Sequence, residues 1–323
     1  MASYIIMPGW NEILREIDDK KNDLNHEKNK LTEQTNNIYT TIVHKYLKDL
    51  STHTKRNTII YYSGWLERRY KTDSIIINDS DKIGFMTAIH KINKSKGLDL
   101  MLHTPGGDVA ATESIIDYLQ SVFNNDIRVI VPQLAMSCGT IIACCSKEII
   151  MGYHSSLGPI DPQIGGKAAY QIIEEFKNEK TAITKEPNLA KLWEPILRQY
   201  PPTLVELCKH SFKWAQVLAK GYLTENMLKD KNDENLVENV VNALTDNEIT
   251  KSHNRHLSLK KCKEIGLNII ALEDDHELQD KMLSIHHSVM IMLNQTEVSK
   301  VILNNDNGSW YQISQHSQKE AKN

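Results

Sequence analysis

The chain has 323 residues, of which 40% are hydrophobic and 24% are charged. This composition is that of a globular protein and excludes wholesale disorder or a collagen-like structure. The 38 basic and 41 acidic residues give a net charge of −3, so the chain lacks the basic excess that nucleic-acid binding requires and no nucleic-acid partner is expected.

The five cysteines are odd in number and too few to form a disulfide framework in a chain of this length. We therefore expect reduced thiols and a cytoplasmic location. The apolar run at residues 134–145 is about half as long as a membrane-spanning helix. The first residues, MASYIIMPGWNEI, lack the basic and apolar regions of a signal peptide. No membrane span is expected.

The first expected elements are helices. Residues 10–51 are polar and helical in pattern, and apolar residues recur at every seventh position (Ile17, Leu24, Leu31 and Ile38). The other heptad core position is mostly lysine or threonine, which argues against a long coiled coil. The pattern favours a surface helix that lies along the body of the protein or along a partner subunit. A second apolar helical face follows at residues 42–50.

Strands and helices then alternate up to residue 151. Strands are expected at 57–62, 74–77, 98–103, 127–131 and 148–151, and helices at 81–94, 108–123 and 137–146. The short links between them predict an α/β fold with parallel strands that are buried on both faces.

The remaining chain is predicted to be mostly helical. After a Gly/Pro loop at 152–166, helical patterns dominate to about residue 245. A short helix at 257–265 should end at Gly266. A strand at 267–272, a helix at 277–293 and a hairpin around residues 306–308 should follow.

Two segments stand out as candidates for a site of acyl transfer. Gly106 and Gly107 follow a strand in HTPGGD, and consecutive glycines allow a turn whose amides can hold an anionic oxygen. Ser137, in AMSCGT, lies where a strand-end loop enters a helix, so its hydroxyl could attack a carbonyl. A plain tight turn or a phosphate cradle would explain the glycines equally well, and a helix N-cap would explain the serine. Both segments end expected parallel strands, which favours a shared site at one sheet edge.

The sequence resembles the serine dehydrogenase proteinase family, relatives of signal peptide peptidase A within the Clp/crotonase superfamily. The resemblance covers about residues 10–287. It rests on NTIIYYSGWL (57–66), LDLMLHTPGGDVAATESI (98–115), VIVPQLAMSCGT (129–140), IIMGYHSSLGPIDPQIGG (149–166) and SHNRHLSLKKCKEIGLNI (252–269).

The resemblance implies a serine peptidase with the Clp/crotonase spiral fold of repeated ββα units, a polypeptide substrate and a homo-oligomer. By position, Ser137 would be the nucleophile of an acyl-enzyme mechanism. The amides of Gly107 and Cys138 would form the oxyanion hole, and Gly106 would permit the turn. The peptidase domain would span residues 57–275, between an N-terminal helical extension (1–56) and a C-terminal helix and hairpin (276–323).

The general base is left open by the sequence. Clp relatives carry a histidine close to the position of Asp161, so their triad is not reproduced here. Signal peptide peptidase relatives use a lysine, for which the candidates are Lys167, Lys209 and Lys213. We favour a third option, His253 with Asp161, which would form a Ser–His–Asp set in a different chain order. A turn or loop role would also explain Asp161 and His253.

No metal or other cofactor is expected. The neighbouring pair His286 and His287 cannot easily face one ion from a helix, and no zinc-type spacing exists. We expect His103 to be a satisfied histidine of the core.

Two alternative functions stay open at this point. A crotonase-like acyl-thioester hydrolase or transferase would use the same oxyanion geometry. A catalytically silent assembly scaffold would use the N-terminal helix to dock a partner. The chain has no P-loop, so any ATPase that unfolds substrates would be a separate protein.

Overall fold

The computed structural model of the chain describes residues 9–24, 31–67, 73–245 and 254–313. Seven strands form the main sheet: β1 (Asn57–Ser63), β2 (Leu98–His103), β3 (Ile127–Val131), β5 (Glu148–Met151), β10 (Ile269–Ala271), β11 (Val298–Asn304) and β12 (Ser309–Ile313). Their order is β10-β5-β3-β2-β1-β11-β12. The first five in this order run parallel. Strand β11 pairs antiparallel with β1, and β12 pairs antiparallel with β11.

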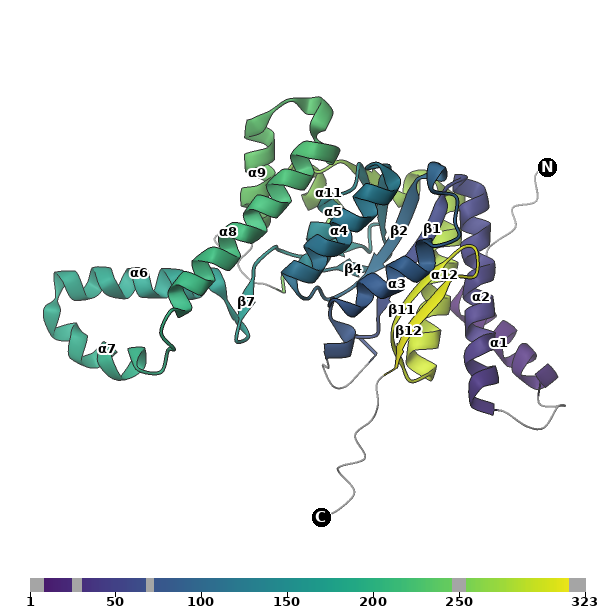
Figure 1. Cartoon of the computed structure of the whole chain (residues 1–323), viewed down its shortest axis with the longest axis horizontal. Helices are drawn as coiled ribbons and strands as arrows, with labels where there is room; N and C mark the ends of the chain where they lie inside the picture. Colours follow the sequence, from purple (N-terminus) through teal and green to yellow (C-terminus); the bar gives the residue numbers. More distant parts are fainter. Residues whose placement is uncertain (1–8, 25–30, 68–72, 246–253, 314–323) are drawn as a thin grey trace, which may run out of the picture.

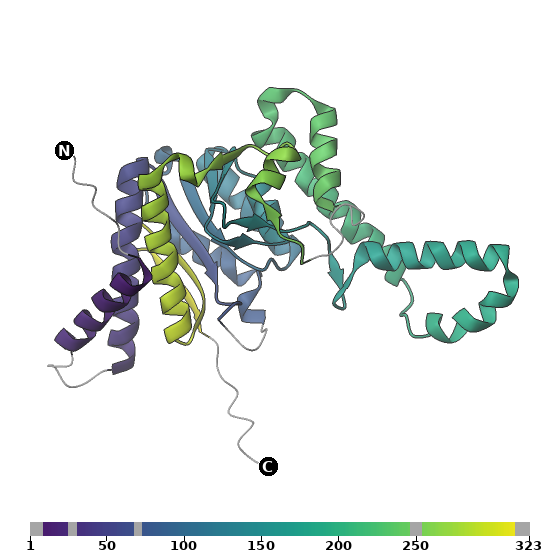
Figure 2. The same cartoon turned by 180° about the vertical axis from the view of Figure 1, so that it is seen from behind.

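Helices cover both faces of this sheet (Figures 1 and 2). One face is covered by α3 (Ser80–Ile89), α4 (Val109–Phe123), α5 (Cys138–Cys144), α9 (Glu234–Thr245) and α11 (Leu259–Glu264). The other face is covered by α1 (Trp10–Leu24), α2 (Leu31–Thr54) and α12 (His276–Gln295). In β1, Ile59 faces the first core and Ile60 the second. This two-sided burial explains why the central strands are continuously apolar.

The smaller elements lie around the site and in a projecting arm. One small sheet consists of β4 (Leu134–Ala135), β6 (Ser156–Leu157) and β9 (Leu257–Ser258). A second one consists of β7 (Gln163–Ile164) and β8 (Lys167–Ala168). The helices α6 (Ala169–Lys185), α7 (Ala190–Leu197) and α8 (Leu204–Tyr222) follow, and α6, α7 and the start of α8 project from the body as an arm (Figure 1). Single turns of 3₁₀ helix lie at Asp73–Ile75, Lys94–Lys96, Pro187–Leu189, Lys229–Lys231 and Leu272–Asp274, and a π-helical turn lies at Leu223–Met227.

The α/β class and the mostly parallel sheet are confirmed, and one predicted element is wrong. Residues 74–77 do not form a strand, because Asp73–Ile75 make a 3₁₀ turn and only Ile77 makes a β-bridge, with Gly107. Ile75 and Ile77 are buried and Ile76 is exposed, an alternation that imitates a strand. The spiral of ββα units and the three-part division of the chain stay predictions.

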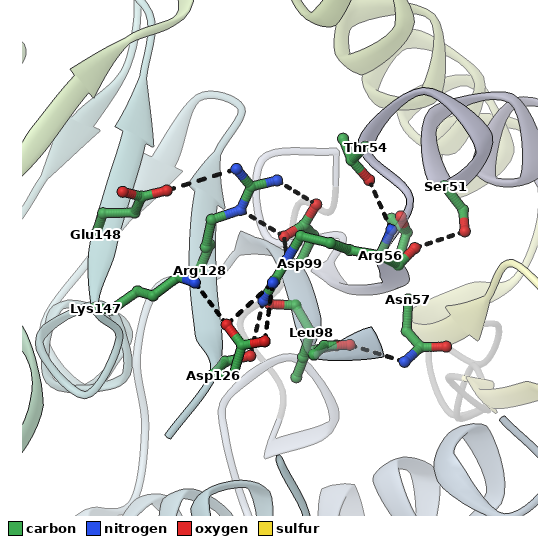
Figure 3. Close-up of polar contacts among 12 residues, drawn as sticks. Ser51, Thr54, Arg56, Asn57, Leu98, Asp99, Asp126, Arg128, Lys147 and Glu148 are labelled. Atoms are coloured by element: carbon green, nitrogen blue, oxygen red, sulfur yellow. Dashed lines mark hydrogen bonds and ion pairs between the residues drawn. The ribbon is translucent and has the colours of Figure 1, made fainter. Parts of the chain in front are cut away.

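A charged network joins the amino ends of four neighbouring strands (Figure 3). Asp99, which is fully buried in β2, accepts hydrogen bonds from Arg56 Nε at 2.7 Å and from Arg128 Nη2 at 2.7 Å. Arg56 also lies 3.0 Å from Asp126, which pairs with Lys147 at 2.6 Å. The fully buried carboxylate of Asp99 is thus compensated by two partly buried guanidinium groups.

We expect the variant Asp99→Asn to lose about 3 kcal/mol of the free energy of unfolding, because two partly buried cations lose their shared anion. Urea unfolding measures this loss. The control is Lys147→Met, which breaks an exposed pair and should change stability by less than about 1 kcal/mol. Equal losses in the two variants would contradict this reading of the network.

Candidate active site

Two turns meet at the carboxyl ends of the parallel strands. Thr104, which follows β2, is bridged to Ala135 in β4: its N–H donates to Leu134 O at 3.1 Å and its carbonyl accepts from Met136 N–H at 3.0 Å. Gly106 has φ +98°, and a Cβ added to it would lie 2.7 Å from the Cβ of Ser137. Only glycine permits this approach of the two turns.

Ser137 adopts a backbone conformation that is unusual for a residue with a side chain. Its φ of 53° and ψ of −116° lie outside the regions that most residues occupy. The turn is held by hydrogen bonds from Gly139 N–H to Met136 O and from Thr140 N–H to Ser137 O, both at 2.8 Å. Ser137 precedes α5, yet its side chain makes no capping hydrogen bond. It is partly exposed while both neighbours in the chain are buried.

Two backbone amides lie at this junction with no acceptor. Gly106 O accepts from Ile77 N–H at 2.9 Å, and in a trans peptide the next N–H, that of Gly107, points to the opposite side. The N–H of Cys138 is in the first turn of α5, where no intrahelical acceptor exists. Neither N–H donates to any other residue that the structure describes. Such donors can hold the oxyanion of an acyl-transfer intermediate.

The junction opens into a pocket of about 380 Å³. Ser137, Gly107 and Cys138 line it together with apolar side chains that include Val109, Ile141, Ile160 and Trp214. A second pocket of about 360 Å³ shares Ile76 and Pro105 with the first and is bordered by Trp65, Met136, Asn254 and His256. The two pockets therefore adjoin across the glycine turn.

The candidate bases are distributed unequally around this pocket. Asp161 lines it, is 1% exposed and accepts a hydrogen bond from Gln163 Nε2 at 3.3 Å. His253 lies outside the described residues, and the next residue, Asn254, borders the second pocket.

The three candidate lysines do not line the pocket. Lys209 and Lys213 are exposed on α8, and Lys209 pairs with Glu206 at 2.7 Å. Lys167 lies over the ring of Tyr200 at 5.1 Å. In this structure, Asp161 is thus the sequence-derived acid–base candidate that shares a pocket with Ser137.

His103 is buried, as expected, on the sheet face that α12 covers. The expectation that its hydrogen bonds are satisfied is wrong, because neither ring nitrogen has a partner among the described residues. Its ring lies 5.4 Å from that of Tyr62 and 5.8 Å from that of His286. Burial lowers the pKa of His103 to about 4, so the ring is neutral at pH 7. His103 does not line the pocket of Ser137.

Several site features have no signal in the sequence. Ser211 and Trp214 reach the pocket from α8, about 75 residues after the nucleophile in the chain. Cys138 Sγ donates to Gly107 O at 3.1 Å, so the cysteine side chain itself joins the two turns. The described residues contain no group of three or more histidine, cysteine or acidic side chains arranged to hold a metal ion.

A partly exposed serine at a strand-to-helix turn, in one pocket with two amide donors, is an arrangement typical of acyl-transfer hydrolases. The chain belongs to the ClpP-like SDH-type serine proteinase family, whose family model matches residues 26–292. This confirms the family resemblance found in the sequence.

Two curated relatives are the uncharacterised proteins MJ0137 and MJ1495 of Methanocaldococcus jannaschii. They are 32% and 30% identical to this chain over 195 residues, which is 60% of the chain in each case and 60% and 59% of the relatives. The chain thus matches about three fifths of their length.

A solved structure with similarity is a serine-to-alanine mutant of the membrane-bound stomatin-specific protease 1510-N. It is 16% identical, with a TM-score of 0.36, and the match covers 64% of this chain and 79% of that one. At this score the likeness carries no argument. None of the helices in the described ranges is long and apolar enough to span a bilayer.

Proposed function

We propose that the protein is a serine endopeptidase with Ser137 as its nucleophile. The observation that carries this proposal is the contact between the Gly106 and Ser137 turns, which places the partly exposed Ser137 in one pocket with Gly107 and Cys138, whose N–H groups have no acceptor among the described residues. Family membership supports the peptidase class.

In this mechanism, Ser137 Oγ attacks the carbonyl carbon of the scissile bond and its proton moves to the base. The carbonyl oxygen becomes an oxyanion that accepts hydrogen bonds from the amides of Gly107 and Cys138. The C–N bond then breaks, and the base returns the proton to the leaving amine. Water, deprotonated by the same base, hydrolyses the acyl-enzyme and frees Ser137.

For the base we propose His253, oriented and charge-stabilised by Asp161. The position of Asp161 in the pocket of Ser137 supports its part of this pair. Asn254, which directly follows His253 in the chain, borders the adjoining pocket together with His256. This position supports the proposal that His253 enters the site. In this arrangement Asp161 takes the third role of a triad without itself accepting the proton.

The two adjoining pockets support cleavage inside a chain. A peptide that crosses Pro105 and Ile76 would place side chains in both pockets. Most lining side chains are apolar, so we propose an unfolded polypeptide with apolar residues around the scissile bond as the substrate.

We also propose a homo-oligomer in a reducing, cytoplasmic compartment. The arm and α8 carry exposed apolar side chains, among them Leu192, Leu207 and Val217, which are 67%, 51% and 54% exposed, and a second copy could cover them. All five cysteines are free and buried, as in reducing compartments. Docking of a partner through the N-terminal helix stays a prediction. In this chain α1 and α2 pack against its own α12.

The variant Ser137→Ala should lose all covalent labelling by a fluorophosphonate probe and reduce peptide hydrolysis by at least about 10³-fold, because it removes the proposed nucleophile. Gel fluorescence and a peptide assay measure both losses. The control is Ser211→Ala, which changes a serine of the same pocket and should keep the labelling. A Ser137→Ala protein that labels like wild type would exclude this nucleophile.

Variants of the candidate bases should separate into two groups. We expect Asp161→Asn and His253→Ala each to lower kcat by about 10²- to 10⁴-fold, and the double variant to lose little more, because the residues act as a unit. Lys167→Met, Lys209→Met and Lys213→Met should stay within about twofold of wild type, since none lines the pocket. Inactivation by one lysine variant, with Asp161→Asn active, would assign the base to that lysine instead.

A further inference from the structure

Residues 75–78, which we name the bracket, hold the glycine turn (Gly106 and Gly107) through backbone hydrogen bonds. Ile77 N–H donates to Gly106 O and Ile77 O accepts from Asp108 N–H, both at 2.9 Å. A Cβ on Gly107 would lie 2.3 Å from Ile77 N, so the two backbones are in direct contact. The two bonds fix the peptide planes on both sides of Gly107, and therefore the direction of its N–H.

The bracket is in turn fixed by buried side chains from other elements. Lys300 Nζ, on β11, donates to Ile76 O at 2.6 Å and to Asp81 Oδ1 at 2.7 Å. Asp81 Oδ2 accepts from Asn78 N–H at 3.0 Å. Lys300 and Asp81 thus contact the backbone on either side of Ile77, and both side chains are 0% exposed.

Two further hydrogen bonds complete the support. Tyr61 OH, on β1, donates to Asp81 Oδ2 at 2.8 Å. Ser63 Oγ donates to Ile75 O. Five backbone groups of the bracket, Ile75 O, Ile76 O, Ile77 N–H, Ile77 O and Asn78 N–H, are therefore bonded either to a buried side chain or to the glycine turn.

A fully buried ion pair is a poor source of stability, because two well-packed apolar residues of similar volume often stabilise a core as much or more. The contacts of Asp81 and Lys300 indicate another role, because both side chains also bind the backbone of the bracket. We propose that Asp81 and Lys300 are positioning residues that aim the Gly107 N–H at the oxyanion. This inference rests on the proposed function and adds the residues that set the geometry of its site.

The effect should fall on the transition state. The oxyanion forms only during the reaction, so a tilted Gly107 N–H weakens the transition state more than the bound substrate. A change in the direction of the Gly107 N–H therefore lowers kcat and leaves KM nearly unchanged. A general loss of stability would instead lower the amount of folded enzyme and leave the kcat of the folded fraction intact.

The test compares the double variant Asp81→Asn/Lys300→Met, which leaves no buried charge unpaired, with Asp99→Asn, which breaks the network at the opposite end of the strands. We expect the double variant to lose at least about tenfold in kcat per folded enzyme, with KM within about twofold. Its affinity for a peptide boronate, which mimics the tetrahedral intermediate, should fall in the same proportion as kcat/KM. Asp99→Asn should keep kcat and boronate affinity within about twofold, even if its loss of stability is greater.

Two single variants keep the inference testable if the double variant does not fold. Tyr61→Phe and Ser63→Ala each remove one supporting hydrogen bond and no charge, and both should lower kcat with KM unchanged, by less than the double variant. A folded double variant with the kcat of Asp99→Asn, or single variants with unchanged kcat, would overturn the inference while an active wild type upholds the peptidase. A wild type that neither cleaves peptides nor binds the boronate would overturn both.

Discussion

The site depends on one contact, that of the Gly106 turn with the Ser137 turn. The space between them leaves no room for a Cβ, and the bridge from Thr104 to Ala135 sets the register of the approach. Because β2 and β3 run parallel, the turns that follow them leave the same edge of the sheet. Ser137 from one turn and Gly107 from the other thus line the same pocket.

Charge is used differently at the two ends of the sheet. At the amino ends, Arg56 and Arg128 share Asp99 and connect four strands through contacts that are partly open to solvent. At the carboxyl end, one fully buried pair, Asp81 with Lys300, fixes the backbone of the bracket. The first network ties strands together, and the second orients a single peptide group where the chemistry is proposed. The antiparallel strand β11 is what brings Lys300 to this place, so the C-terminal hairpin is tied to the site.

The sequence predicted those parts whose cause is local. The strands at 98–103 and 127–131 have the predicted bounds, because continuous apolar runs identify strands buried on both faces. Residues 74–77 are not a strand, since Asp73–Ile75 form a 3₁₀ turn and, within the described residues, the segment makes a single β-bridge, between Ile77 and Gly107. The role proposed for Lys300 has no sequence signal, because its partner Asp81 is 219 residues away. The base could not be assigned from spacing, since Asp161 comes to the pocket of Ser137 through tertiary structure alone.

A crystal structure of the protein after reaction with a peptidyl phosphonate tests the central claim most directly. The account predicts phosphorus bonded to Ser137 Oγ, with the phosphoryl oxygen within about 3 Å of the nitrogens of both Gly107 and Cys138. Phosphorus on another side chain, or a phosphoryl oxygen directed away from both amides, would contradict it.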